Sequence, residues 1–94
     1  MKDKEQKIIV TLFGSDKIGI VAKLTQKLAE LGVNIEDIKQ TIMQDYFVMF
    51  LLGDISQSNY TFSEIKEGLD AVGKELQMEI WVQKKDIFDK MHTV

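Results

Sequence analysis

The chain has 94 residues, 45% hydrophobic and 29% charged, with a formal net charge of −3 at pH 7. This length suits one domain, and the composition is that of a globular chain rather than a disordered one. Because the balance is acidic and all twelve basic residues are lysines, binding to nucleic acid or to an anionic membrane is not expected.

The chain contains no cysteine, which excludes a disulfide framework, a thiolate nucleophile and cysteine-based metal sites. Residues 1–7 are charged and lack the apolar core of a signal peptide. The longest apolar run, 46–52, is much shorter than the roughly 20 residues of a membrane-spanning helix. We therefore expect a cytoplasmic protein with no membrane partner, no cofactor and no metal.

The first third of the chain predicts a strand followed by a helix. Residues 7–13 are rich in β-branched side chains and predict a buried strand, which Gly14 ends. Apolar residues then recur at helical spacing from Ile20 to Leu31. Gly32 stands where a glycine commonly closes a helix. The pattern therefore predicts one strand and one helix with an apolar face.

Two strands joined by a tight turn are predicted next. Residues 33–44 form the first, in which the apolar spacing breaks strict alternation and predicts a bulge near Glu36 and Asp37. A turn around Gln44 and Asp45 leads into residues 46–53, whose nearly continuous apolar sequence is typical of a central strand.

The last third predicts a second helix, a fourth strand and a short tail helix. Residues 54–61 read as a polar loop. Apolar residues from Phe62 to Leu76 step by three and four and predict a helix, and residues 78–82 alternate as a strand does. Helical spacing in residues 86–91 predicts a short helix that docks on the core.

The order βαββαβ predicts an α+β ferredoxin-like sandwich: a four-stranded antiparallel sheet with two helices on one face and a short C-terminal helix. We expect residues 1–94 to form a single domain, with its core at 8–82 and the docking helix at 86–91. One sheet face is then free of helices and invites a partner. The residues expected on it are Phe13, Phe47, Met49 and Trp81.

The turn between the first strand and the first helix is the main candidate site. One interpretation is purely structural: Ser15 or Asp16 caps the helix. The other is that the free amides at the helix start receive a carboxylate while Asp16 holds an ammonium group, which suits a free amino acid. Asn34 follows the helix, where asparagine is also common simply as a turn residue.

Asp16-Lys17-Ile18-Gly19 followed by Leu31-Gly32-Val33-Asn34-Ile35, inside a βαββαβ chain, resembles the ACT domain family. The resemblance spans residues 8–82, and the tail at 86–91 resembles that of small stand-alone bacterial ACT proteins. ACT domains are regulatory modules that bind amino acids and related effectors, usually where two copies pair. The resemblance therefore implies a homodimer with a small-molecule effector.

In this family the strand-to-helix turn contacts the ligand, and the asparagine after the helix reaches it across the dimer interface. One position departs from the family pattern: Ile18 stands where a proline often precedes the turn glycine, which leaves the turn less rigid. The ligand-binding residues that the resemblance implies, with their neighbours, are Ser15, Asp16, Lys17, Ile18, Gly19, Ile20, Asn34 and Ile35.

Other site classes find little support in the residues. His92, the single histidine, lies near the chain end and has no companion ligands at metal-binding spacing. Glu36 and Asp37 could share an acid–base site only if the bulge turns them to one side. The strand at 46–52 has aromatic residues but no lysine, which disfavours an RNA-stacking platform. The resemblance to acylphosphatases would require an arginine in the first turn.

We therefore predict a non-catalytic regulatory protein that binds an amino-acid-like effector near a dimer interface and acts on an enzyme or regulator. The alternative is an interaction module that dimerises, as an adaptor or regulatory subunit, without using the pocket. An enzyme ranks third, because the chain offers no recognisable nucleophile or metal cluster.

Overall fold

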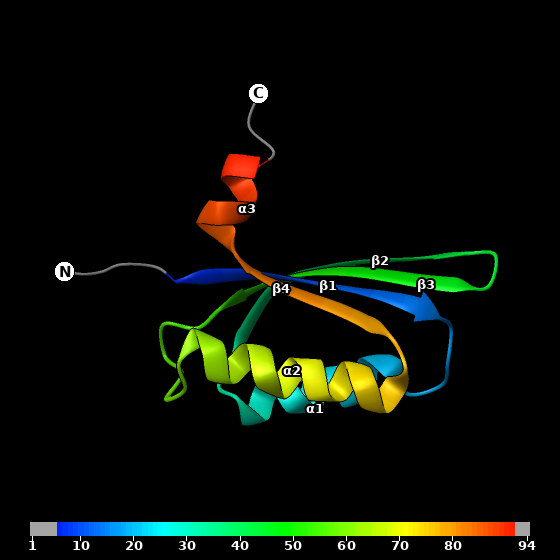
Figure 1. Cartoon of the computed structure of the whole chain (residues 1–94), viewed down its shortest axis with the longest axis horizontal. Coiled ribbons are helices and arrows are strands. Elements are labelled where there is room, and N and C mark those ends of the chain that lie inside the picture. Colours follow the sequence, from blue (N-terminus) through cyan, green and yellow to red (C-terminus); the bar gives the residue numbers. More distant parts are fainter. Residues whose placement is uncertain (1–5, 92–94) are drawn as a thin grey trace.

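A computed structural model of the chain describes residues 6–91. The backbone follows the predicted order of four strands and two helices, with the predicted short helix at the C-terminal end (Figure 1). The elements are β1 (Lys7–Ser15), α1 (Ile20–Glu30), β2 (Asn34–Met43), β3 (Tyr46–Asp54), α2 (Phe62–Leu76), β4 (Glu79–Lys84) and α3 (Lys85–Met91).

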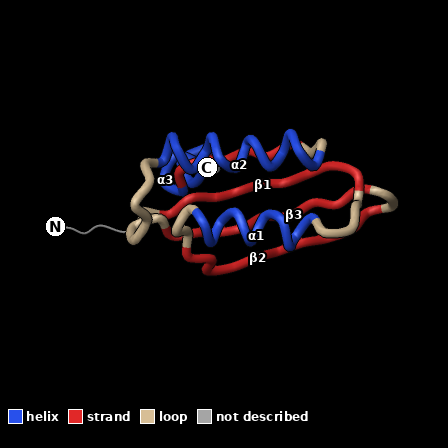
Figure 2. The backbone as a smooth tube through the Cα atoms, turned by 90° about the horizontal axis from the view of Figure 1, so that it is seen from below, coloured by secondary structure: helices blue, strands red, loops and turns tan. Residues whose placement is uncertain are grey.

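The four strands form one antiparallel sheet in the order β2-β3-β1-β4, so β1 and β3 are central while β2 and β4 are edges. Helices α1 and α2 lie side by side across one face of this sheet (Figures 1 and 2). The short α3 rises on the other side of the sheet (Figure 1). The predicted ferredoxin-like α+β fold is confirmed.

The core lies between the sheet and the two long helices. Alternate residues of β1 and β3 point into it because side chains of a strand alternate between the faces. Each long helix contributes residues spaced by three or four. The buried side chains at the centre are Ile8, Val10, Leu12, Leu24, Leu28, Met49, Leu51, Ile65 and Leu69.

The predicted composition of the open sheet face is half right. Phe13 and Trp81 lie on it and are 45% and 60% exposed. Phe47 and Met49 do not: they are buried against the helices, and their neighbours Val48 and Phe50 face outward instead. Every residue from 46 to 52 is apolar, so the sequence pattern alone could not decide which alternate set faces the core.

Several local predictions are confirmed. The register between β2 and β3 shifts between Ile35 and Asp37, which is the expected bulge. Gln44 adopts a positive φ of 57° in the hairpin turn. Gly32, at φ 74°, follows α1, and its amide and that of Val33 bond to carbonyls of the last helical turn.

Gly14 does not end the first strand, contrary to the prediction. β1 continues to Ser15, and Gly14 pairs with Phe47 of β3. A Cβ atom at position 14 would lie only 3.0 Å from the side chain of Met78. The glycine is therefore favoured by close packing next to the start of β4 rather than by a turn.

The short C-terminal helix is present as α3, which begins at Lys85, one residue earlier than expected. Its Ile87 is half exposed, and the helix stands away from α1 and α2 (Figure 1). Its docking on the core stays a prediction. Among residues 6–91, no helix is long and apolar enough to cross a membrane.

Candidate functional site

The turn from β1 into α1 is held by backbone geometry rather than by a side-chain cap. The amide of Asp16 donates to the carbonyl of Asp45 in the β2–β3 turn, at 2.9 Å. Gly19 is the N-cap of α1, with φ 88° and no side-chain hydrogen bond to the helix start. Neither Ser15 nor Asp16 caps the helix, which corrects the purely structural interpretation of these residues.

This uncapped start leaves the first amides of α1 without side-chain partners. The carbonyl of Gly19 accepts the first helical bond, from the amide of Lys23 at 3.0 Å. A glycine is needed at position 19 for its left-handed backbone and not for space, because a Cβ atom placed there would have no neighbour within 4 Å. The helix start is thus open to an anionic group.

The side chains of the turn are exposed, with one exception. Asp16, Lys17 and Ile18 face solvent, and Ile18 is fully exposed. Ile20 is buried and packs into the core, so it anchors the helix start rather than lining an open site. An exposed carboxylate and an open helix start therefore lie within four residues of each other.

Lys17 links this turn to the end of α2. Its ammonium group donates to the carbonyl of Leu76 and lies 3.4 Å from the side-chain oxygen of Gln77. Gln77 has a left-handed backbone, φ 58°, and ends α2. No local sequence pattern indicates this contact, because the residues that it joins are 59 and 60 positions apart.

Asn34 and Ile35 lie at the other end of the sheet. Asn34 begins β2, is exposed and pairs with Asp54, whereas Ile35 is partly buried against the core. Asp54 pairs in turn with Lys7 at the start of β1. Since Ser15 lies eight residue steps along β1 from Lys7, the two parts of the predicted site are roughly 26 Å apart within one chain.

Exposed apolar side chains surround the turn end of the sheet. The rings of Phe13 and Tyr46 stack with their centroids 6.1 Å apart. Ile42 and Met43, at the end of β2, are 58% and 67% exposed. Such a cluster beside a polar turn is typical of a surface that contacts a partner.

Among the carboxyl groups of residues 6–91, Asp54 is the one whose pKa is clearly shifted. The amide of Ser56 donates to its Oδ1 at 2.9 Å, and the Ser56 hydroxyl adds a second bond. These bonds, helped by the charge of Lys7 and opposed by burial, lower the pKa of Asp54 below its ordinary 3.8. This carboxylate fixes the loop after β3.

The groups considered for catalysis do not converge. Glu36 binds the ammonium of Lys7 at 2.5 and 2.6 Å, while Asp37 is exposed on the neighbouring position of the bulge. Within residues 6–91, no cluster of three or more acidic or histidine side chains could hold a metal ion. His92 lies outside the described residues.

A family model described as the ACT domain matches residues 6–83. The chain belongs to the ACT domain family. A UPF0237 protein of Listeria innocua is 46% identical over 86 residues, covering 92% of this chain and 97% of the relative.

Two solved structures complete the comparison. An ACT domain protein from Streptococcus pneumoniae, 39% identical, superposes with a TM-score of 0.79 over 90% of this chain and 96% of that one. The regulatory subunit of aspartate kinase from Thermus thermophilus is 27% identical, with a TM-score of 0.66 over 83% of this chain and 51% of that one. This ACT domain is thus similar both to a small separate protein and to part of a regulatory subunit.

Proposed function

We propose that this ACT protein is a non-catalytic regulator that binds an amino-acid-like effector between two copies of the chain. The observation that carries the proposal is the exposed start of α1, where Gly19 leaves the helix amides without a side-chain cap. Its partial positive charge suits the effector's carboxylate, and Asp16 suits its ammonium group. Similarity to a regulatory subunit of aspartate kinase supports a role in regulation.

The distance between the turn and Asn34 supports a site built from two chains. β2 is an edge strand that runs parallel to β1, so its end at Met43 lies at the turn end of the sheet. If two β2 edges pair antiparallel about a two-fold axis, the start of one lies beside the end of the other. Asn34 of one copy then approaches the Asp16–Gly19 turn of its partner.

Lys17 offers a route for the response. Its ammonium group is bound at the end of α2. A carboxylate at the turn competes for this ammonium group, and its release removes a partner from the last carbonyls of α2. Effector binding and the arrangement of α2 and the β4 edge are then linked, and a partner enzyme or regulator that contacts this edge is controlled.

Mixing two variants tests the two-chain site directly. Asp16→Ala and Asn34→Ala should each abolish the thermal shift that a panel of amino acids at millimolar concentration gives with the wild type. A mixed dimer, however, contains one site with both changes and one intact site. After random exchange, about a quarter of the sites should bind again, as measured by calorimetry.

The outcomes separate the alternatives. Failure of mixing to restore binding means that both halves of the site lie in one chain, or that one of them is not used. If no amino acid shifts the wild type, the effector model fails. A dimer whose stability changes neither with amino acids nor with Asp16→Ala or Asn34→Ala favours the ligand-independent interaction module. The exposed Phe13, Phe50 and Trp81 also suit such a module.

A further inference from the structure

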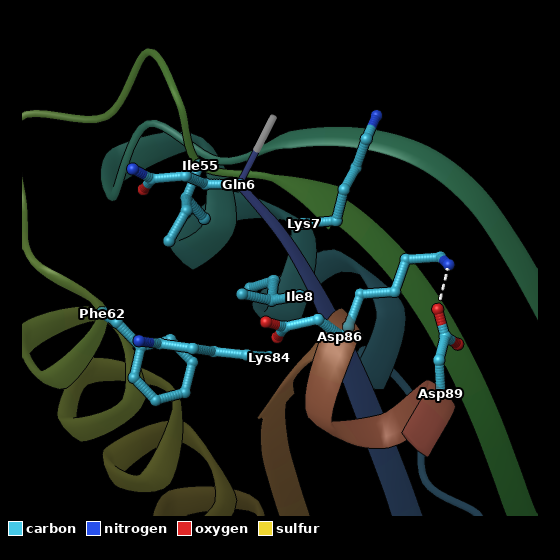
Figure 3. Close-up of a pocket in the computed structure, with 9 residues that line it drawn as sticks. Gln6, Lys7, Ile8, Ile55, Phe62, Lys84, Asp86 and Asp89 are labelled. Atoms are coloured by element: carbon cyan, nitrogen blue, oxygen red, sulfur yellow. Dashed lines mark hydrogen bonds and ion pairs between the residues drawn. The ribbon is translucent and has the colours of Figure 1, made fainter. Parts of the chain in front are cut away.

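A cavity of about 640 Å³ lies at the end of the sheet away from the Asp16–Gly19 turn (Figure 3). Its walls come from the start of β1, the loop after β3, the start of α2 and the junction of β4 with α3. None of the residues implied by the ACT resemblance lines it. It is therefore separate from the effector site proposed above.

The inner wall of this cavity is apolar and firmly placed. Ile8 is fully buried and Ile55 is 6% exposed, while Phe62 packs against the core with its ring partly uncovered. The amide of Ile55 bonds to the carbonyl of Gln6 at 2.8 Å, which fixes the loop beside β1. This wall can receive the hydrocarbon part of a small molecule.

Two opposite charges at the cavity have no ion-pair partner among residues 6–91. The ammonium of Lys84 lies 5.3 Å from the centre of the Phe62 ring, and the Asp86 carboxylate accepts only the amide of Ile87, at 2.9 Å. In Figure 3 the Lys84 side chain runs toward Phe62, while the Asp86 carboxylate points from the start of α3 toward Ile8. Both charges border the apolar wall.

The other charged side chains of the rim are already paired. Lys7 binds Glu36 at 2.5 Å, and Lys85 binds Asp89 at 2.5 Å, which Figure 3 draws as a dashed line. The charge left for a ligand is therefore one lysine and one carboxylate. A simple anion would pair with Lys84 but be repelled by Asp86. A simple cation would pair with Asp86 but be repelled by Lys84.

We propose that this cavity is a second ligand site, which takes a small zwitterion with an apolar side chain. Lys84 binds its carboxylate, Asp86 binds its ammonium group, and Ile55 and Phe62, backed by the buried Ile8, contact its hydrocarbon part. All of these residues belong to one chain, so this site needs no second copy. It goes beyond the proposed effector site and does not depend on it.

Titrations with three related compounds test the ligand chemistry. L-leucine carries both charges, 4-methylpentanoate only the carboxylate, and isopentylamine only the ammonium group. Amide shifts in the NMR spectrum of the full chain report binding near Ile55, Phe62 and Ile87. We expect leucine to bind about five- to tenfold more tightly than either analogue, because each analogue loses one ion pair.

Two variants assign the charges, and both positions are exposed, so neither change should disturb the fold. Lys84→Met keeps the apolar stem and should lower the affinity for leucine to the wild-type affinity for isopentylamine. The affinity of this variant for isopentylamine itself should equal that of the wild type. Asp86→Asn should lower it to that of 4-methylpentanoate. Lys66→Met is the matched control, since Lys66 pairs with Asp70 on α2, away from the cavity.

Equal binding of leucine and its analogues overturns the proposal, as does unchanged leucine affinity in Lys84→Met. Shifts confined to residues 16–19 and 34 also overturn it, while supporting the effector site. Conversely, Asn34→Ala should leave the shifts around Phe62 intact. The two sites can therefore fail independently of each other.

Discussion

The loops that lead into the two long helices, α1 and α2, are stabilised in different ways. The loop of residues 55–61 is tied by side chains: the hydroxyl of Ser58 donates to the carbonyl of Leu31 at 2.5 Å and accepts from the amide of Tyr60. It ends in a capping box between Thr61 and Glu64. The turn of residues 16–19 has no such bond to its helix.

The difference shows which helix start is structural and which is available. Thr61 and Glu64 satisfy amides at the start of α2, so this end offers little to a ligand. At the start of α1, Gly19 supplies backbone geometry and no cap. The loop before α2 is therefore fixed by its own side chains, whereas the turn before α1 leaves its helix amides without a side-chain cap, where the proposed effector would bind.

Removing the capping box should have the largest effect on stability. Thr61→Ala deletes the hydroxyl that accepts from the Glu64 amide at 3.1 Å, and we expect a loss of about 1–2 kcal/mol in the free energy of unfolding. Urea denaturation measures this. Thr61→Ser keeps the hydroxyl and is the control. An equal loss in both variants would mean that the cap is not responsible.

A side chain at position 19 should cost less stability but affect binding more. Gly19→Ala forces alanine into φ 88°, which we expect to cost about 1 kcal/mol and to shift the helix start. Gly19→Asn is the matched control, because asparagine tolerates this backbone region better. Stability in urea denaturation and affinity in effector titration should both decrease from glycine to asparagine to alanine at position 19. If the alanine variant equals the wild type in both measurements, the left-handed backbone of Gly19 has no such role.

The smallest expected effect is a pH dependence that arises in the loop before α2. Because the folded pKa of Asp54 lies below its ordinary 3.8, the charged carboxylate stabilises the fold at neutral pH. This contribution is complete above the unfolded pKa and is lost as the pH falls through the lower, folded pKa.

Urea denaturation of the wild type and of Asp54→Asn should therefore differ at pH 7 and converge on acidification below the ordinary value of 3.8. Asp16→Asn, in the turn before α1, is the comparison variant. A difference between wild type and Asp54→Asn that does not shrink with acid would contradict the assigned cause.

Much of the fold could be predicted because local signals and the global arrangement agree. The spacing of apolar residues in 62–76 matches α2 at both ends, and the break in alternation near Glu36 marks the observed bulge. Which alternate residues of β3 face the core could not be predicted, because every residue from 46 to 52 is apolar. The role of Gly14 could not be predicted either, because its reason, the side chain of Met78, is distant in sequence.

The candidate site was harder to predict, since it depends on what lies across the fold. The glycine at position 19 and the exposed turn could be foreseen, but the contact of Lys17 with Leu76 could not. The cavity beside Lys84 and Asp86 has no sequence signal, because its members come from four separate elements. The ligand-binding role of the turn and Asn34 stays a prediction.

The separation of the turn from Asn34, at opposite ends of β1 and β2, has a consequence for the cell. An effector site that uses both must be assembled from two chains, so its occupancy depends on protein abundance as well as on effector level. At low expression, even abundant effector would find few complete sites. If the proposed two-chain site is correct, changing the amount of this protein would therefore reset the effector concentration at which it responds.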